Sequence, residues 1–328
     1  MKKFKYICLL ALFYVNAIWA ATPIFQIVPL GTSGGEFEDN LSSYLIRAFP
    51  TNAFVALDAG TLCSSINKIP EKTIEQLSGQ PVTREVFFKE NIKAYLISHD
   101  HLDHISGLVL CSTMDTKKEL IGIPSTIKFL TENIFNWKIW PNFADQGTAP
   151  TLKQYHYHIL NFNQNYSIPQ TGITVRAFPL SHGPGYQSTA FLLESKGQYL
   201  LYLGDTGADV LEKSHDLQLL WQSIAPLIKS KKLRAIAIES SYTNAQPDNK
   251  LFGHLNPHWL LNELRVLAKT VDPKHPELAL KDLPVLVTHI KQGLEKENNA
   301  KIIMHQLNDQ NDLGVQFILP KSGNIINF

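Results

Sequence analysis

Cysteine is scarce in this sequence, and neither sign of charge is in excess. Only 3 of the 328 residues are cysteine, and the formal net charge is +1. With so few cysteines, the fold must rest on its hydrophobic core rather than on a disulfide framework. A near-neutral chain also lacks the basic character with which nucleic-acid-binding proteins hold phosphates, although a local basic patch stays compatible with it. We therefore expect a globular protein without a nucleic-acid partner.

Long apolar runs are missing everywhere except at the N-terminus. There, lysines among the first five residues precede a mostly apolar segment, residues 7–18, and Ala20 then offers a cleavage site. This order is typical of a secretory signal peptide, and the run is shorter than the roughly 20 residues of a membrane-spanning helix. We predict a signal peptide over 1–20, one mature domain over 21–328, a periplasmic or secreted location and no stable membrane anchor.

Two cysteines, Cys63 and Cys111, remain in the predicted mature domain. An oxidising compartment favours a disulfide between them. Burial as two free thiols agrees with the sequence at least as well, so the pairing stays open.

Strands and helices follow one another along the whole mature chain. Apolar and alternating runs predict strands at 24–30, 41–49, 53–57, 93–97, 173–180, 188–194, 199–203, 234–238, 284–288 and 315–319. Helical spacing predicts helices at 64–77, 83–91, 124–133, 217–230, 257–269 and 292–298. Residues 135–165 fit neither pattern, and we interpret them as an irregular insertion that is either a wall of the site or a surface loop packed on its own aromatics. The pattern predicts an α/β protein with two packed sheets and helices outside them.

The densest group of metal-ligand side chains is the run Ser-His-Asp-His-Leu-Asp-His at residues 98–104. Imidazole and carboxylate are the usual ligands of zinc and similar ions. His99 and His101 are spaced to bind one ion, and Asp103 and His104 can turn to a second. A structural zinc site would favour cysteine, which is absent from the run, and a plain polar loop would not concentrate ligands of one kind. The run follows a predicted strand, where irregular backbone can direct several side chains at one point.

Further candidate ligands follow four other predicted strands. They are His182, Asp205, Glu239 and His289. A single histidine or carboxylate after a strand is more often a capping or turn residue. The repetition of the pattern indicates instead that one face of a sheet sandwich carries the site.

These residues resemble the ligand series of the metallo-β-lactamase superfamily, and most closely that of the class II 3',5'-cyclic-nucleotide phosphodiesterases. Residues 99–112 are similar to that family's signature almost throughout, and Thr113 departs from it. The other segments that resemble the family are Asn40–Tyr44, Gly204–Gly207, Glu239–Ser241 and Phe252–Leu255. The resemblance spans residues 27–289 and weakens within 135–165 and in the C-terminal tail.

The resemblance implies a metallo-β-lactamase-like αββα sandwich, with two mixed sheets and helices on the outer faces. It also implies two zinc ions per chain, or other divalent ions in their place. The first ion would be bound by His99, His101 and His182, and the second by Asp103, His104 and His289, with Asp205 bridging both. Asp58 would orient the ligand loop.

The implied activity is the opening of 3',5'-cyclic nucleotides, cAMP and also cGMP, to nucleoside 5'-monophosphates by a hydroxide that bridges the two ions. His254 is the candidate acid for the leaving oxygen, and Glu239 would orient it and raise its pKa. Asp103 counts among the catalytic residues as well as the metal ligands. Without the resemblance, a helix-capping role for His254 and a surface position for Glu239 would rank first.

Two other readings stay open. Another hydrolase on the same scaffold, such as a ribonuclease Z-like nuclease, an arylsulfatase or a lactonase, would use the same ligands. A non-catalytic zinc-binding periplasmic protein would bind metal without turnover, but the complete ligand set with spare coordination for water argues against it. The expected partner is a small-molecule cyclic nucleotide, and a homodimer is the alternative to a monomer.

Overall fold

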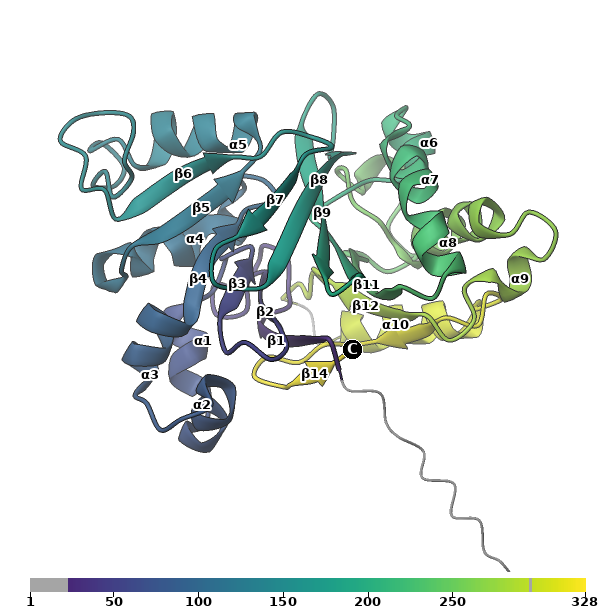
Figure 1. The fold of residues 1–328 in the computed structure, drawn as a ribbon. Helices are drawn as coiled ribbons and strands as arrows, with labels where there is room; N and C mark the ends of the chain where they lie inside the picture. Colours follow the sequence, from purple (N-terminus) through teal and green to yellow (C-terminus); the bar gives the residue numbers. More distant parts are fainter. Residues whose placement is uncertain (1–22, 295–296) are drawn as a thin grey trace, which may run out of the picture.

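The computed structural model describes residues 23–294 and 297–328, so the predicted signal peptide lies outside the described residues. Two seven-stranded sheets pack face to face, and helices cover their outer faces (Figure 1). In the described part of the chain, no helix combines the length and the apolar character that a membrane span requires.

The first sheet has the strand order β14-β1-β2-β3-β4-β5-β6. Its strands are β1 (Phe25–Gly31), β2 (Ser43–Ala48), β3 (Phe54–Leu57), β4 (Ile92–Leu96), β5 (Lys118–Gly122), β6 (Tyr155–Ile159) and β14 (Ile326–Asn327). Strands β1 to β3 pair antiparallel, and β3 to β6 pair parallel. The first sheet is therefore mixed, as the resemblance implied.

The second sheet has the order β13-β12-β11-β10-β9-β8-β7. Its strands are β7 (Asn165–Ile168), β8 (Ile173–Ser181), β9 (Gln187–Ser195), β10 (Gln198–Leu203), β11 (Leu233–Glu239), β12 (Pro284–Thr288) and β13 (Gln316–Ile318). Strands β7 to β10 pair antiparallel, and β10 to β13 pair parallel.

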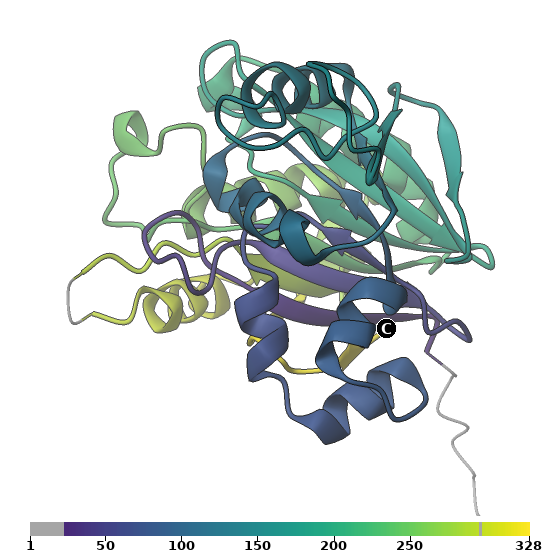
Figure 2. The same ribbon diagram turned by 90° about the vertical axis from the view of Figure 1, so that its left-hand side faces the viewer.

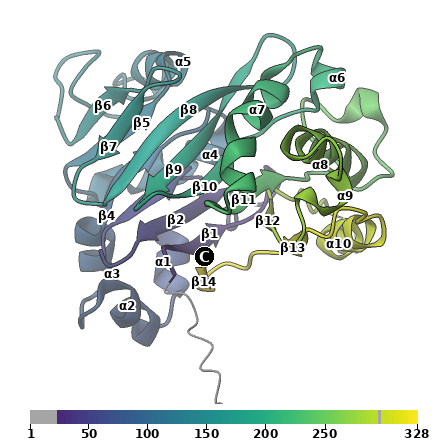
Figure 3. The same ribbon diagram turned by 45° about the vertical axis from the view of Figure 1, so that its right-hand side comes forward.

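The helices divide between the two outer faces (Figure 3). The first sheet is covered by α1 (Cys63–Lys68), α2 (Glu71–Ser78), α3 (Arg84–Val86), α4 (Leu102–Cys111) and α5 (Pro124–Phe129). The second half of the chain contains α6 (Asp209–Glu212), α7 (Asp216–Lys229), α8 (Pro257–Val271), α9 (Pro276–Ala279) and α10 (Asn299–Asp309). The described architecture is the predicted αββα sandwich.

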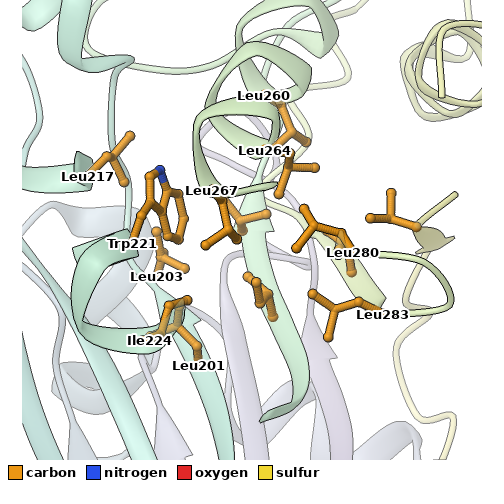
Figure 4. Close-up of a cluster of buried hydrophobic side chains, with 14 of the residues drawn as sticks. Leu201, Leu203, Leu217, Trp221, Ile224, Leu260, Leu264, Leu267, Leu280 and Leu283 are labelled. Atoms are coloured by element: carbon orange, nitrogen blue, oxygen red, sulfur yellow. The ribbon is translucent and has the colours of Figure 1, made fainter. Parts of the chain in front are cut away.

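Side chains of β10 alternate between two hydrophobic cores, one between the sheets and one under the helices. Leu200 and Tyr202 point between the sheets, whereas Leu201 and Leu203 point outward toward α7 and α8, because side chains alternate across a strand. Figure 4 shows the outer core, in which Trp221 packs with leucines of α8 and of the segment after it. This packing buries the outer face of the second sheet.

Five predicted elements differ from the structure. The helices over 83–91 and 124–133 begin as α3 and α5 and continue as the π-helical turns Phe87–Asn91 and Leu130–Ile134. The helix over 64–77 is broken into α1 and α2 at Pro70, because proline has no N–H to continue a helix. The helix over 292–298 is wrong: the described residues on either side of 295–296 are not helical, and α10 begins at Asn299. The irregular insertion is shorter than predicted, because β6 within it pairs with β5.

Cys63 and Cys111 form a disulfide, with their Cα atoms 6.2 Å apart. It joins the start of α1 to the end of α4. The sequence left open whether these cysteines are bonded or free, and in this structure they are bonded.

Candidate active site

Strand ends from both sheets converge at one edge of the sandwich. Strands β10, β11 and β12 are parallel neighbours, so their carboxyl ends share an edge. Strand β8 runs in the same direction as β10, because β9 lies antiparallel between them. The residues at these ends are His182, Asp205, Glu239 and His289. The loop after β4 and the first turn of α4 add His99, His101, Asp103 and His104.

The first ligand cluster consists of His99, His101, His182 and Asp205, whose donor atoms all lie within 4.8 Å of one another. Nε2 of His99 lies 3.2 Å from Nδ1 of His101, which lies 3.3 Å from Nε2 of His182. Oδ2 of Asp205 is 3.7 Å from Nε2 of His99 and 3.8 Å from Nε2 of His182. Three nitrogens and one oxygen that converge in this way form the donor set of a cation site.

The second cluster consists of Asp103, His104, Asp205 and His289, again with all donor atoms within 4.8 Å. Oδ2 of Asp205 is 3.3 Å from Nε2 of His104 and 3.1 Å from Nε2 of His289. Oδ2 of Asp103 is 3.1 Å from the same His289 nitrogen. Asp205 belongs to both clusters, so its carboxylate lies where a bridging ligand would lie.

The protonation of two histidines and one unpaired atom fit divalent ions, whereas Asp205 and Asp58 outweigh burial and raise the pKa of His104. Burial and the neighbouring His104 lower the pKa of His99, and burial lowers the pKa of His182 to about 4, so both rings offer lone pairs at neutral pH. Burial would raise the pKa of Asp205, but the imidazoles of His289 and His104 hold it well below its usual range. The buried Nε2 of His104 lies 3.3 Å from Oδ2 of Asp205, but not in the geometry of a hydrogen bond. Imidazole and carboxylate donors without thiolate suit zinc and similar ions.

Asp58 is buried behind the clusters and holds the ligand loop in place. Its carboxylate lies 2.8 Å from Nδ1 of His104 and accepts hydrogen bonds of 2.8 Å from both the backbone N–H and the hydroxyl of Ser98. The Tyr202 hydroxyl donates to it at 2.6 Å. Because Asp58 engages Nδ1 of His104, Nε2 is left to face Asp205. This geometry agrees with the orienting role expected for Asp58.

Other neighbours of the ligands were not named as site residues from the sequence, although Ser241 and Gly253 lie in segments that resemble the family. Nδ1 of His182 lies 2.8 Å from the Gly253 carbonyl, and Nδ1 of His289 lies 2.9 Å from the Ser241 hydroxyl. The ring of Tyr186 stacks on His101, with centroids 4.5 Å apart and planes 5° from parallel. Tyr186 and Ser241 lie within four residues of a candidate site residue in the sequence, but that proximity alone would not distinguish them from turn residues.

His254 and Glu239 form a buried pair beside the clusters. Nδ1 of His254 is 2.9 Å from Oε1 of Glu239 and 3.8 Å from Oδ2 of Asp205. Burial would lower the pKa of His254, but the Glu239 carboxylate outweighs it and raises the pKa above its ordinary value. Glu239 is not a surface carboxylate, and the capping residue of α8 is Asn256 rather than His254. Both alternative interpretations of this pair are therefore wrong.

A cavity of about 420 Å³ opens over the clusters. Four of the candidate ligands, His101, Asp103, His182 and Asp205, line it together with Gly35, Leu102, Tyr242, Phe252, His254 and Lys291. Residues 135–165 do not contribute to this lining. Their Trp140 instead donates to the Ser112 hydroxyl at the end of α4, at 2.9 Å, so they form a packed surface segment and not a wall of the site.

The sequence model of the family described as class II cAMP phosphodiesterases matches residues 25–323 of this chain. The chain belongs to this family. A 3',5'-cyclic-nucleotide phosphodiesterase of Aliivibrio fischeri is 40% identical over 335 residues, covering 100% of both chains. A probable 3',5'-cyclic-nucleotide phosphodiesterase of Yersinia pestis is 38% identical over 309 residues, covering 92% of this chain and 89% of the relative.

Solved structures support the fold of this class II phosphodiesterase. Unliganded yeast PDE1 superposes with a TM-score of 0.81 at 22% identity and covers 94% of this chain and 100% of its own. The metallo-β-lactamase-fold protein YhfI from Bacillus subtilis superposes with a TM-score of 0.59 at 13% identity, covering 94% of this chain and 100% of its own. The predicted family, enzyme class and metallo-β-lactamase fold are confirmed.

Proposed function

We propose that this class II phosphodiesterase hydrolyses 3',5'-cyclic nucleotides, cAMP and also cGMP, to nucleoside 5'-monophosphates with two zinc-like ions. The observation that carries this proposal is the pair of donor clusters that share Asp205. Two ions bound there would lower the pKa of a shared water and neutralise charge on the phosphoryl oxygens. The names of the bacterial relatives support the same substrate class.

In this proposal, the residues of each cluster would bind one of the two ions. His99, His101 and His182 would hold the first ion, and Asp103, His104 and His289 would hold the second. Asp205 would serve both ions, because its carboxylate lies beside both donor sets. Asp58 fixes the His104 tautomer, so that the ring presents Nε2 to the site.

His254 protonates the leaving 3'-oxygen in the proposed reaction. A nucleoside alkoxide is a poor leaving group, so the break of its bond to phosphorus needs a proton donor. Glu239 holds Nδ1 of His254, which leaves Nε2 free to carry that proton toward the cavity. A metal-storage protein has no use for a buried acid beside its ions, so this pair favours an enzyme over a non-catalytic zinc-binding protein.

Product analysis with purified protein tests the proposal. cAMP, cGMP and a 2',3'-cyclic nucleotide are each incubated with metal-replete protein and with a matched Asp205→Ala variant. We expect 5'-AMP and 5'-GMP from the wild type and almost no product from the variant. Formation of 3'-monophosphates, or turnover of the 2',3'-cyclic nucleotide alone, would contradict the proposed reaction.

A further inference from the structure

Phe252 combines backbone strain with an exposed aromatic ring. Its φ is +53°, a left-handed conformation that costs a bulky residue roughly 1–2 kcal/mol. Its side chain is 69% exposed, so packing of the ring does not offset that strain. The neighbouring Leu251 is only 2% exposed, so the chain turns at this point from the core into solvent.

The backbone around Phe252 is locked to the candidate active site. The carbonyl of Gly253 lies 2.8 Å from Nδ1 of His182. A Cβ added at Gly253 would lie 2.4 Å from the backbone nitrogen of Gly183, so the two loops are in direct contact. The ring of Phe252 is therefore exposed but carried on a fixed support next to a ligand of the first cluster.

Leu102 is a second exposed apolar side chain at the same cavity. It is the first residue of α4, lies between His101 and Asp103 in the sequence, and is 69% exposed. Phe252 and Leu102 both line the cavity of about 420 Å³ over the clusters. In Figure 2, the green loop after β11 projects on the same side of the molecule as the purple loop after β1.

Phe252 and Leu102 lie where they could contact the nucleobase, the part of the substrate that the two clusters would not bind. In a cyclic nucleotide, the phosphate ring reaches the ions and the flat base extends away from them. A base has two apolar faces, and stacking of one face on an aromatic side chain contributes about 1–3 kcal/mol. An exposed aromatic side chain at the cavity rim meets that requirement.

We propose that Phe252, together with Leu102, is the platform on which the nucleobase of the substrate stacks. This proposal rests on the proposed function, because it assigns a base site to the same cavity. It also gives a reason why a strained backbone is kept at Phe252: relief of the strain by a different loop path would remove the ring from the rim.

The test compares a substrate with a base and one without. The two substrates are cAMP and methyl riboside 3',5'-cyclic phosphate, which keeps the phosphate ring and replaces the base with a methoxy group. In Phe252→Ala, the ratio of kcat/KM for cAMP to that for the base-free substrate should fall about 5- to 150-fold, which corresponds to about 1–3 kcal/mol. The loss should lie mainly in KM. Phe252→Trp should keep the wild-type ratio, and Phe252→Leu should behave like the alanine variant.

Leu110→Ala is the matched control, because Leu110 is 63% exposed near the other end of α4 and does not line the cavity. It should leave the ratio unchanged, and metal content and melting temperature are measured for every variant. A metal-replete Phe252→Ala with the wild-type ratio would overturn the base platform while the proposed function stands. Wild-type protein that turns over neither substrate would instead overturn the proposed function itself.

Discussion

At the scale of single residues, two buried carboxylates each contact one imidazole of the site. Asp58 lies behind His104 and selects the nitrogen that the ring presents, whereas Glu239 lies behind His254 and favours its protonated form. In the proposed function, the same interaction between carboxylate and imidazole would prepare a metal ligand in one place and a proton donor in the other. The two histidines differ in what lies next to Nε2, the ring nitrogen that the carboxylate does not contact.

His254→Ala should affect substrates according to their leaving group. Turnover of cAMP should fall roughly 10²–10⁴-fold, the usual range for loss of a general acid. Turnover of bis-nitrophenyl phosphate should fall much less, because nitrophenolate leaves without a proton. His289→Ala is the comparison, since it removes a ligand from the second cluster and should damage both reactions. Equal losses on both substrates in metal-replete His254→Ala would show that His254 binds phosphate instead.

Glu239→Gln should move the alkaline limb of the pH–rate profile for cAMP to lower pH. An acid must be protonated to act, so activity falls as pH rises through the pKa of His254. The Glu239 carboxylate raises that pKa above its ordinary value, and the neutral amide removes the charge that does so. The measurement is kcat against pH for the wild type and the variant on cAMP. A limb that stays in place would show that another group supplies the proton.

At the scale of elements, the site depends on how closely loops from different strands approach one another. The loop after β1 lies against the second cluster: the backbone N–H of Gly35 donates to Oδ2 of Asp103 at 3.0 Å. A Cβ added at Gly34 would lie 2.4 Å from Cε1 of His289. The glycine-containing turn is therefore part of the wall that positions His289.

Gly34→Ala should displace the His289 ring and weaken the second ion. We expect a fall in bound metal from about two ions toward one, together with a loss of cAMP turnover, while the melting temperature of metal-free protein changes little. Gly122→Ala serves as the control, because a Cβ there meets Thr126 at 3.3 Å, away from the clusters. Elemental analysis measures the ions. An unaltered metal content in Gly34→Ala would refute the close contact.

At the scale of the whole molecule, the metal clusters join the two sheets. The loop after β4 belongs to the first sheet, whereas β8, β10 and β12 belong to the second, and both clusters take ligands from each side. Ions that bind only the folded state stabilise it by mass action. The metal centre should therefore contribute to stability as well as to chemistry.

Removal of metal should lower the thermal stability of the whole protein. A site filled at 100 times its Kd contributes about 2.7 kcal/mol, so a chelator should lower the melting temperature of the wild type. Asp205→Ala should start from a lower melting temperature in metal and respond less to the chelator, because Asp205 belongs to both clusters. Calorimetry with and without chelator measures both effects. Identical melting curves for wild-type protein would contradict metal-linked folding.

Export of the protein is also a prediction about the whole molecule. Residues 1–25 fused to a reporter that is active only outside the cytoplasm should produce signal, because a basic start, an apolar stretch and a small residue form a signal peptide. The mature N-terminus should be Ala21 or close to it, as read by mass spectrometry. An intact Met1 on folded cytosolic protein would remove the localisation proposal.

Several elements escaped prediction because their stability comes from pairing across the sheet. The segment Lys118–Gly122 carries two charged residues, so its sequence does not predict a strand. It nevertheless lies between β4 and β6 and pairs with both. The strand Asn165–Ile168 is polar because it is the edge of its sheet. The long antiparallel strands of the second sheet were predicted correctly, because the alternation of β8 and the apolar runs of β9 and β10 are each visible within a single segment.

The sequence by itself determined the chemistry of the centre. Imidazoles and carboxylates at 99–104 and after later strands are a property of the covalent chain, and donor type decides which ions suit them. Which donors meet was implied by the family resemblance alone, and the tertiary structure brings them together: Asp205 between two clusters and Glu239 buried behind His254. Only the tertiary structure decided that Cys63 is bonded to Cys111. Each of these contacts joins residues distant in the chain, and only the packing of the two sheets brings them within reach.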